Sequence, residues 1–534
     1  MQPQAVALAN YSEYPSSVVA VAPFALADEH YAAVKTRLTS AEAGAMSHSD
    51  LERLLEVEGH ELMRRLLQDH LRLRAQQERE LGVHGPVVGC DGVVRTHLRD
   101  SERGLMTVFG DVDIERLAHH APGSESLRPL DAALNLPAES FSFGVRRRVA
   151  EEAIRGSFDE ALAAIVAHTG ARLSKRQLEE LAIRAATDFE PFYVTRQELP
   201  PAAVAELSDL LVITTDGKGV VMRRSALRAA TRKAAERARH KLKRRLTKGE
   251  KKNRKRMAQV AAVYTVAPFY RTPEDIMREL DRKDETPTPR PRPEQKRVWA
   301  SVRDEAEEVV RAAFAEAAWR DPQRRKTWVA LSDGNETQLE LLEQLAREYG
   351  VKLIIVLDLI HVTEYLWKAT TVFNDEASPE AEAWVTERLL PILRGKARNV
   401  AAGVRRSATL RGLSRKERKA ADTCADYLLK YTKYLHYNEY LAAGLPIATG
   451  VIEGACRHLV KDRMDITGAR WGLAGAEAIL KLRALRSSGD FAEYWAFHEQ
   501  QEWARNHAER YANGAVPALR QPGPRGRPRL TLVK

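Results

Sequence analysis

Four carboxylates lie where they could act together on a metal ion. Asp216 ends the apolar run "LLVITT", Asp333 ends "WVALS" and Asp358 ends "LIIVL". Glu453 stands beside a glycine in the helical segment "GVIEGACRHLV". Mg²⁺ and Mn²⁺ prefer oxygen ligands and leave coordination positions open for water and phosphate. Carboxylates that converge without a cation repel one another, so convergence here would indicate bound divalent metal.

Each carboxylate also has an ordinary structural explanation. Asp216-Gly217 between two apolar runs is typical of a hairpin turn. Asp333-Gly334 can end a strand and cap the next helix, and a helical glutamate is usually just solvated. The glycines around Glu453 favour close approach by another backbone or by a ligand. It is the order of these carboxylates along the chain that favours a shared site.

Asp358 competes with Asp333 for the second position in such a site. Asp333 ends the fourth strand of the series described below and Asp358 ends the fifth, so Asp333 is the preferred candidate. His361 follows three residues after Asp358, and this pair can support the site through hydrogen bonds or orient a bound polyanion. The simpler alternative is that His361 only begins the next helix.

The elements that must position these residues alternate in a recognisable order. Helices are expected at 293–320 and 338–349. Strands are expected at 210–215, directly after residue 217, at 257–266, at 327–332 and at 351–357. Three antiparallel strands followed by two parallel ones with helical crossovers is the ribonuclease-H-like succession, whose chemistry is metal-dependent phosphoryl transfer. That succession places a carboxylate on the first strand, one after the fourth and one on a later helix.

We therefore predict an α+β, multidomain protein with a ribonuclease-H-like α/β catalytic core and an all-α insertion. A helix-turn-helix region and a small β subdomain precede this core. The expected segments are 1–82 (N-terminal arm and amphipathic helices), 83–136 (small antiparallel β subdomain), 137–200 (helix-turn-helix region), 205–362 (first part of the core), 363–445 (all-α insertion), 446–500 (C-terminal helices of the core) and 501–534 (basic tail). Within the core, 223–256 is a basic segment and 271–299 a Pro-rich loop.

The helix-turn-helix prediction depends on residues 158–184. A helix is expected to end near Thr169, with a break at Gly170 and a second helix that opens on the capping box "SKRQ" at Ser174. Lys175 and Arg176 then lie at the tip of the second helix, where such motifs contact DNA. An ordinary helical hairpin in a core is the alternative.

The charge balance favours a polyanionic partner. The chain holds 84 Lys and Arg against 73 Asp and Glu, a formal charge of +11. Residues 223–256 hold 17 Lys and Arg against two Glu, among them Arg244, Arg245, Lys251 and Lys252. Such a density repels itself unless it is neutralised, and DNA phosphates are a common neutraliser. A solvated face or a disordered arm is the alternative.

The cysteines and the apolar segments indicate the cellular compartment to expect. Three scattered cysteines, Cys90, Cys424 and Cys456, form neither a disulfide framework nor a zinc cluster, which fits a reducing cytoplasm. No run of 18 apolar residues occurs, so no membrane span is expected. The apolar patch at 18–27 has no basic residues before it, so a signal peptide is not expected either.

Taken with these motifs, the chain resembles insertion-sequence transposases of the ISKra family, within the wider Mutator-like DDE group. The resemblance covers about residues 93–506 and rests on "TTDGKG", "LSDGN", "DLIHVTEYLW" and "GVIEGACRHLVKDRMDITGARW". In that group a Cys-or-Asp, two residues, His signature follows the second catalytic aspartate. Here "DLIH", from Asp358 to His361, lies 25 residues after Asp333.

The resemblance implies that Asp216, Asp333 and Glu453 are the catalytic and metal-binding residues, with Asp358 and His361 auxiliary. Two Mg²⁺ or Mn²⁺ ions are implied as cofactors. The implied partner is double-stranded DNA, as terminal inverted repeats and as target. Metal-activated water would cleave the element ends, and the freed 3′-hydroxyl would attack target DNA. A homodimer or larger assembly on DNA, in the bacterial cytoplasm at the nucleoid, is also implied.

Further candidate DNA contacts follow Glu453. Arg457, Lys461 and Arg463 fall on or near one helix and can hold the scissile phosphate or flanking DNA. Trp471 can stack on a base, with core packing as the alternative. One departure from the family is a missing cysteine pair after the small sheet, where His119 and His120 stand instead, so a zinc ribbon is not expected.

Two other functions stay open at this stage. A transposase-derived DNA-binding regulator would bind DNA without catalysis, although it would have no need to keep every carboxylate. A stand-alone nuclease of the ribonuclease-H fold would cut DNA without joining it.

Overall fold

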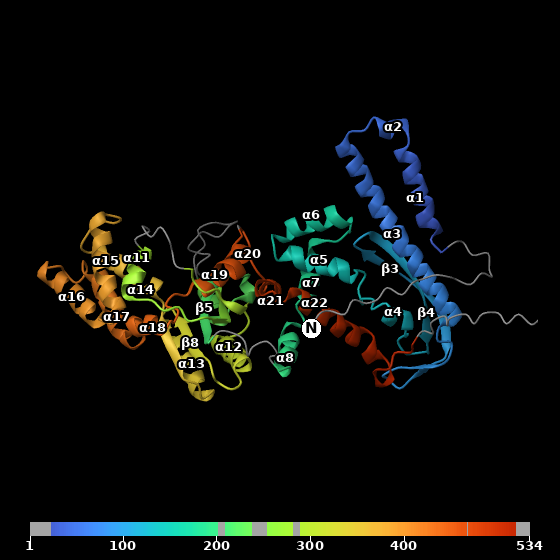
Figure 1. Cartoon of the computed structure of the whole chain (residues 1–534). Coiled ribbons are helices and arrows are strands. Elements are labelled where there is room, and N and C mark those ends of the chain that lie inside the picture. Colours follow the sequence, from blue (N-terminus) through green and yellow to red (C-terminus); the bar gives the residue numbers. More distant parts are fainter. Residues whose placement is uncertain (1–22, 201–208, 238–253, 281–288, 467, 519–534) are drawn as a thin grey trace, which may run out of the picture. The chain divides into compact units, whose positions relative to one another are not determined.

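The computed structural model describes residues 23–200, 209–237, 254–280, 289–466 and 468–518 (Figure 1). The chain divides into two compact units. The first comprises residues 1–149, 162–174 and 499–534, and the second comprises residues 150–161 and 175–498. The predicted α+β class is confirmed. None of the helices in the described ranges is long and apolar enough to cross a membrane.

The first unit is built on a long helix and a two-stranded sheet. Helix α3 (His48–Leu81) packs against strand β4 (Gly110–His120), which pairs antiparallel with β3 (His97–Thr107). Its core gathers Leu71, Leu105, Val112, Ile114 and Leu136. The small antiparallel sheet expected after residue 83 is therefore present. The remaining elements here are α1 (Ala25–Leu38), α2 (Ala41–Gly44), β1 (Val87–Val88), β2 (Val94–Arg95), α4 (Pro129–Ala133), η5 (Ala508–Arg510) and η6 (Ala512–Gly514).

The second unit holds a mixed five-stranded sheet. Its strands are β5 (Leu210–Val221), β6 (Lys255–Val266), β7 (Glu294–Ser301), β8 (Thr327–Ser332) and β9 (Leu353–Leu357). They lie in the order β7-β6-β5-β8-β9. The pairs β5–β6 and β6–β7 are antiparallel, whereas β5–β8 and β8–β9 are parallel. The central strand β5 is buried from Leu210 to Thr215, which explains its continuous apolar run.

The strands expected at 210–215 and directly after residue 217 are one continuous strand, β5, and one strand of the sheet lies where no strand was expected. The hairpin interpretation of Asp216-Gly217 is wrong, because β5 runs straight through both residues and pairs with β6 along its whole length. A Cβ at Gly217 would lie 3.0 Å from the Cε atom of Met257 on β6, the flexible end of an exposed side chain. The third strand is β7, in a stretch where the helix from 293 was expected. That helix, α12 (Ala306–Arg320), begins later.

Helices pack around this sheet. α12 contacts β5 and β6, and α13 (Glu336–Glu348) connects β8 to β9. Near the C-terminus, α19 (Gly450–Ala455) contacts β5 and β6 and continues into a π-helical turn, η4 (Cys456–Lys461), and α20 (Asp462–Met464). Next, α21 (Leu473–Ser488) packs on β7. Its buried Glu477 accepts hydrogen bonds from the Ser301 hydroxyl and the N–H of Val302, both at 2.9 Å.

A group of helices between β9 and α19 matches the expected all-α segment (Figure 1). It comprises α14 (Leu359–Thr370), α15 (Pro379–Leu393), α16 (Ala397–Leu410), α17 (Lys419–Lys430), η3 (Thr432–Tyr434) and α18 (Tyr437–Ala442). Helix α11 (Pro273–Leu280) packs on α15. The range 271–299, predicted as a Pro-rich loop, therefore contains α11 and most of β7; residues 281–288 lie outside the described ranges.

The helices before the sheet follow the predicted pattern. α6 (Phe158–Thr169) and α7 (Lys175–Arg184) have the expected bounds, and Gly170 between them has a φ of +63°, a left-handed conformation that glycine adopts easily. DNA contact by this pair stays a prediction. The other helices are α5 (Phe143–Ala153), α8 (Phe189–Glu198), η2 (Arg224–Ala226), α9 (Ala229–Arg237) and α22 (Phe491–Asn506).

A tight backbone contact joins the all-α segment to the chain after β6. Gly444 has a φ of +73°, its carbonyl accepts the N–H of Phe269, and a Cβ on it would lie 2.9 Å from that nitrogen. We expect Gly444→Ala to lower the free energy of unfolding by about 1–3 kcal/mol. Gly403→Ala is the matched control, since Gly403 is exposed in the middle of α16 with open space around its Cα. That substitution should raise stability by about 0.5–1 kcal/mol in urea unfolding. Equal effects would show that the contact is unimportant.

Candidate metal centre

The parallel strands bring three aspartates to one edge of the sheet. Thr214 on β5 pairs with Leu331 on β8, so Asp216 and Asp333 each lie two residues further along neighbouring strands. Ser332 pairs with Leu357 on β9, so Asp333 and Asp358 each follow by one residue. Neighbouring strands are about 4.8 Å apart, which makes these three positions adjacent. Helix α19, which carries Glu453, contacts β5 at this sheet.

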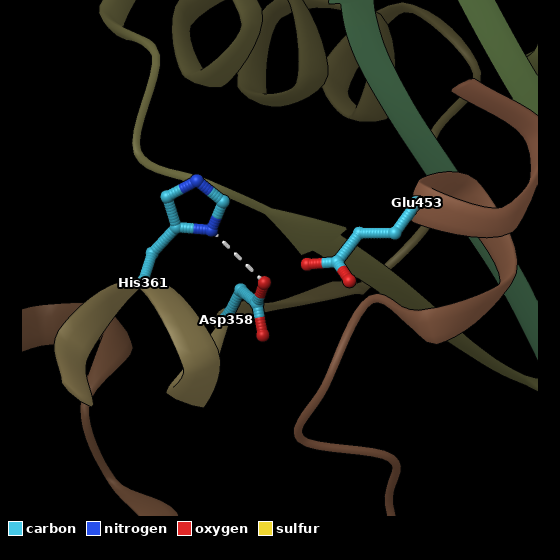
Figure 2. A group of neighbouring side chains, drawn as sticks. All are labelled: Asp358, His361 and Glu453. Carbon is cyan, nitrogen blue, oxygen red and sulfur yellow. Dashed lines mark hydrogen bonds and ion pairs between the residues drawn. The ribbon is translucent and has the colours of Figure 1, made fainter. Parts of the chain in front are cut away.

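Asp358, His361 and Glu453 form the tightest group. Each offers a ligand atom, and these atoms lie within 4.8 Å of one another (Figure 2). Asp358 is fully buried, whereas His361 and Glu453 are half-buried. Within the described ranges this is the one group of three such side chains that meets this distance, so the predicted trio of Asp216, Asp333 and Glu453 is more widely spread.

The hydrogen bonds of Asp358 nevertheless argue against direct metal binding by this residue. Its Oδ1 accepts the N–H of Ile360 at 3.0 Å and that of Thr449 at 3.4 Å. Its Oδ2 accepts the Thr449 hydroxyl at 2.5 Å and a bond from Nδ1 of His361 at 3.0 Å. A carboxylate has about four lone-pair positions, and these bonds occupy all of them. Asp358 therefore caps α14, anchors the residue before α19 and orients His361.

Asp333 is more available. Its Oδ1 accepts the N–H of Asn335 at 2.9 Å, and within the described residues Oδ2 receives no hydrogen bond. Two tyrosines hold the turn after Asp333: Tyr427 on α17, and Tyr431, which directly follows that helix. Tyr427 donates to the carbonyl of Asp333 at 3.2 Å, and Tyr431 donates to that of Gly334 at 2.7 Å. The half-buried carboxylate of Asp333 thus sits on a fixed turn with lone pairs free.

The carboxylates of Asp216 and Glu453 are near enough to repel each other. Asp216 accepts the N–H of Gly217 on Oδ1 at 2.6 Å and the thiol of Cys456 on Oδ2 at 3.1 Å. Burial raises the pKa of Glu453, the negative charges of Asp358 and Asp216 raise it further, and His361 opposes them. No side chain or N–H of the described residues donates a hydrogen bond to the Glu453 carboxylate. A cation is the group that such a carboxylate lacks, so these residues fit a bound divalent metal.

The imidazole of His361 interacts with both Asp358 and Asp333. Its hydrogen bond to Asp358 raises the pKa of His361, burial lowers it, and the charges of Asp358 and Asp333 raise it again. Asp333 is therefore within electrostatic reach of His361, as Asp216 is of Glu453. Asp216, Asp333 and Glu453 could hold a metal ion, because their carboxylate oxygens have lone pairs left, whereas those of Asp358 are occupied.

Several predicted DNA contacts have a different environment from the one expected. Trp471 is 5% exposed and its indole N–H donates to the carbonyl of Met464, so the core-packing alternative holds for it. Arg463 is 2% exposed, lies 4.9 Å from the ring of Phe158 and 4.8 Å from that of Trp471, and donates to the carbonyl of Ala153. A guanidinium buried in this way is not a free surface group.

The other predicted contacts remain on the surface or unseen. Arg457 and Lys461 are exposed on η4. Lys175 is exposed and pairs with Asp159 at 2.7 Å, and Arg176 pairs with Glu180. Arg244, Arg245, Lys251 and Lys252 lie outside the described residues.

Sequence reasoning missed four residues that shape the site: Tyr427, Tyr431, Thr449 and Cys456. The two tyrosines stand four residues apart in the tyrosine-rich stretch "DYLLKYTKYLHYNEY", which marks one helix face but not its partner. Thr449 directly precedes Gly450, and Cys456 follows Glu453 by three residues, so proximity to Glu453 was the one available signal.

No family model matches the chain, and no curated protein matches it either.

Proposed function

We propose that this protein is a DDE transposase of an insertion sequence, which binds terminal inverted repeats and catalyses metal-dependent DNA cleavage and strand transfer. The observation that carries the proposal is the edge of the sheet where Asp216 and Asp333 stand in register, with Glu453 on the helix packed beside them. Carboxylates gathered in this way suit hard divalent cations and the phosphate chemistry that such cations support.

The strand order supports a ribonuclease-H-like core within this proposal. When the five strands are numbered along the chain, their order across the sheet is third, second, first, fourth, fifth. The first three strands pair antiparallel, and the last two are parallel to the first. The carboxylates occupy the first strand, the end of the fourth and a helix after the fifth. The helices from α14 to α18 separate the second position from the third, as an all-α insertion would.

Asp216, Asp333 and Glu453 would hold Mg²⁺ or Mn²⁺, which when bound would supply an activated water and stabilise the leaving oxygen. The chain's own residues arrange the rest. The Cys456 thiol fixes the rotamer of Asp216, and the tyrosines of the α17 region fix the turn after Asp333. Asp358 orients His361 toward the same centre. Arg457 and Lys461, exposed on the turn after Glu453, can position backbone phosphates of DNA.

The test uses the purified full chain with Mg²⁺ or Mn²⁺ and a DNA carrying the inverted repeats that flank its reading frame. We expect cleavage at the repeat ends and joining of the freed ends to a target plasmid. Asp216→Asn should bind the same DNA and leave it intact. Cutting without joined product would indicate a nuclease instead, and binding without cutting by the wild type would indicate a regulator. Normal cleavage by Asp216→Asn would refute the site.

A further inference from the structure

A cavity of the second compact unit lies at the start of α21. It measures about 540 Å³, and its lining includes Arg223, Arg463, Arg470, Gly472 and Gly475. None of the five metal-centre residues lines it. The wall is made by the chain just after β5, the segment before α21, the first turn of α21, the start of α6 and one face of α7.

The beginning of α21 is bare. Its N-cap is Gly472, which has no side chain to accept the first N–H groups, and the first turn holds no acidic residue. Both Gly472 and Gly475 have open space where a Cβ would stand. The free N–H groups and the helix dipole of a 16-residue helix therefore face the cavity without a counter-charge from their own turn.

Arg463 provides an independent sign of a missing anion. This residue lines the same cavity, is 2% exposed, and has no hydrogen-bond acceptor for Nη2 within the described structure. Among the described residues, no carboxylate forms an ion pair with it. Burial, helped by the nearby charge of Arg483 and opposed by that of Glu160, lowers the pKa of Arg463 to about 10. A buried cation without an ion-pair partner is costly, and an anion in the cavity would offset that cost.

The remaining charges of the wall also favour an anion. Arg223 and Arg470 are exposed and form no ion pair within the described ranges. Of the two acidic groups in the lining, Asp159 is already paired with Lys175 at 2.7 Å, which leaves Glu179 against three arginines. A tetrahedral oxyanion can accept hydrogen bonds from helix N–H groups and from guanidinium groups at the same time.

We propose that this cavity binds a phosphate group of a DNA strand, held by the start of α21 together with Arg223 and Arg470, with Arg463 supplying buried positive charge. The DNA source of the phosphate rests on the proposed function. Because the cavity is separate from the carboxylates, phosphate binding here requires no divalent metal.

The first test measures thermal unfolding of the full chain in EDTA, in potassium phosphate or in potassium chloride of equal ionic strength. We expect phosphate to raise Tm by about 2–4 °C. Arg223→Gln with Arg470→Gln should lose at least half of that rise. Arg398→Gln, an exposed arginine on α16 away from the cavity, should keep all of it. Equal Tm in both salts, or equal loss in the control, would overturn the proposal.

A second variant separates occupancy from misfolding. Gly475→Asp places a carboxylate in the first turn of α21, where the side chain meets open space. This variant should have a higher Tm than the wild type without phosphate, since it supplies the anion itself, and should gain nothing from added phosphate. A variant that still gains the full increment would contradict the assigned place.

The third arm asks whether the phosphate belongs to DNA. Fluorescence anisotropy in EDTA compares otherwise identical duplexes with and without a 5′-phosphate. Tighter binding of the phosphorylated duplex, lost in the double variant, assigns a terminal phosphate. Equal binding of both, weakened about fivefold or more in the double variant, assigns a backbone phosphate. DNA affinity that the double variant leaves unchanged refutes the proposal. Asp216→Asn should bind as the wild type does, so failure at the metal centre would not imitate failure here.

Discussion

Asp333→Asn should lower the rate of metal-dependent DNA cleavage by about 10³-fold, a loss of about 4 kcal/mol of transition-state stabilisation. Asparagine keeps the size of the side chain and can still accept the N–H of Asn335, so the free energy of unfolding should change by less than about 1 kcal/mol. Single-turnover cleavage in Mg²⁺ and urea unfolding measure the two quantities. Glu340→Gln, exposed on α13, should change neither.

Asp358→Asn separates the two candidates for the second position. Its carboxylate is fully buried and accepts four hydrogen bonds, two of them from Thr449, and an amide nitrogen cannot accept any. We therefore expect this variant to lose about 2–4 kcal/mol of stability as well as activity. Should it fold as stably as the wild type yet fail to cut, while Asp333→Asn cuts normally, Asp358 would be the metal ligand and Asp333 a turn residue.

Glu316→Ala should produce the largest loss of stability, about 3–5 kcal/mol. Glu316 on α12 is 3% exposed and pairs with Arg297 at 2.5 Å and Arg320 at 2.7 Å, both of which are also buried. Removing the carboxylate leaves two guanidinium groups without their counter-ion in the core. Glu307→Ala on the same helix is the control, because Glu307 pairs with Arg311 on the exposed face, and should cost at most about 0.5 kcal/mol. Similar losses from both would refute the role of burial.

The same carboxylate predicts how stability depends on acid. Burial alone would raise the pKa of Glu316, but the charges of Arg297 and Arg320 outweigh burial and lower the pKa to about 2. A group whose folded pKa lies below its unfolded value stabilises the fold above the unfolded value, near 4.5, and loses that contribution as pH falls toward 2. The acid-unfolding curve of Glu316→Gln should therefore be flatter than that of the wild type between these values.

Much of the fold could be predicted because its strands are buried on both faces. The apolar runs before Asp333 and Asp358 end at the termini of β8 and β9, and the run before Asp216 is the buried first half of β5. The errors have physical causes. Asp216-Gly217 carries the usual turn signal, yet the chain continues as β5 through both residues and pairs with β6 on either side of them. The strand β7, "EQKRVWAS", lies at an edge of the sheet, so its first three residues are polar and exposed and lack a strand pattern.

The candidate site was predictable only in outline. The predicted order of elements placed Asp216 and Asp333 on two strands of one sheet and Glu453 on a later helix. In the structure these two strands are neighbours, and the helix with Glu453 contacts the strand with Asp216. The sequence could not show that Thr449 would saturate Asp358, since those residues are 91 positions apart and come together only when α19 docks beside α14. Nor could it show that Arg463 and Trp471 are buried, because cationic and aromatic side chains suit a DNA surface as well as a core.

The π-helical turn that follows Glu453 determines which way the residues after it point around the helix axis. A turn of this kind contains one residue more than an α-helical turn, and each residue of an α-helix advances the backbone by about 100°. The surplus residue in η4 lets Glu453 and Cys456 both face β5 while Leu459, Val460 and Met464 still reach the core. If one residue were deleted from this turn, either Glu453 would turn away from β5 or the buried residues after it would leave the core. An insertion or deletion in this turn would therefore rotate the Glu453 carboxylate relative to the buried residues that follow it.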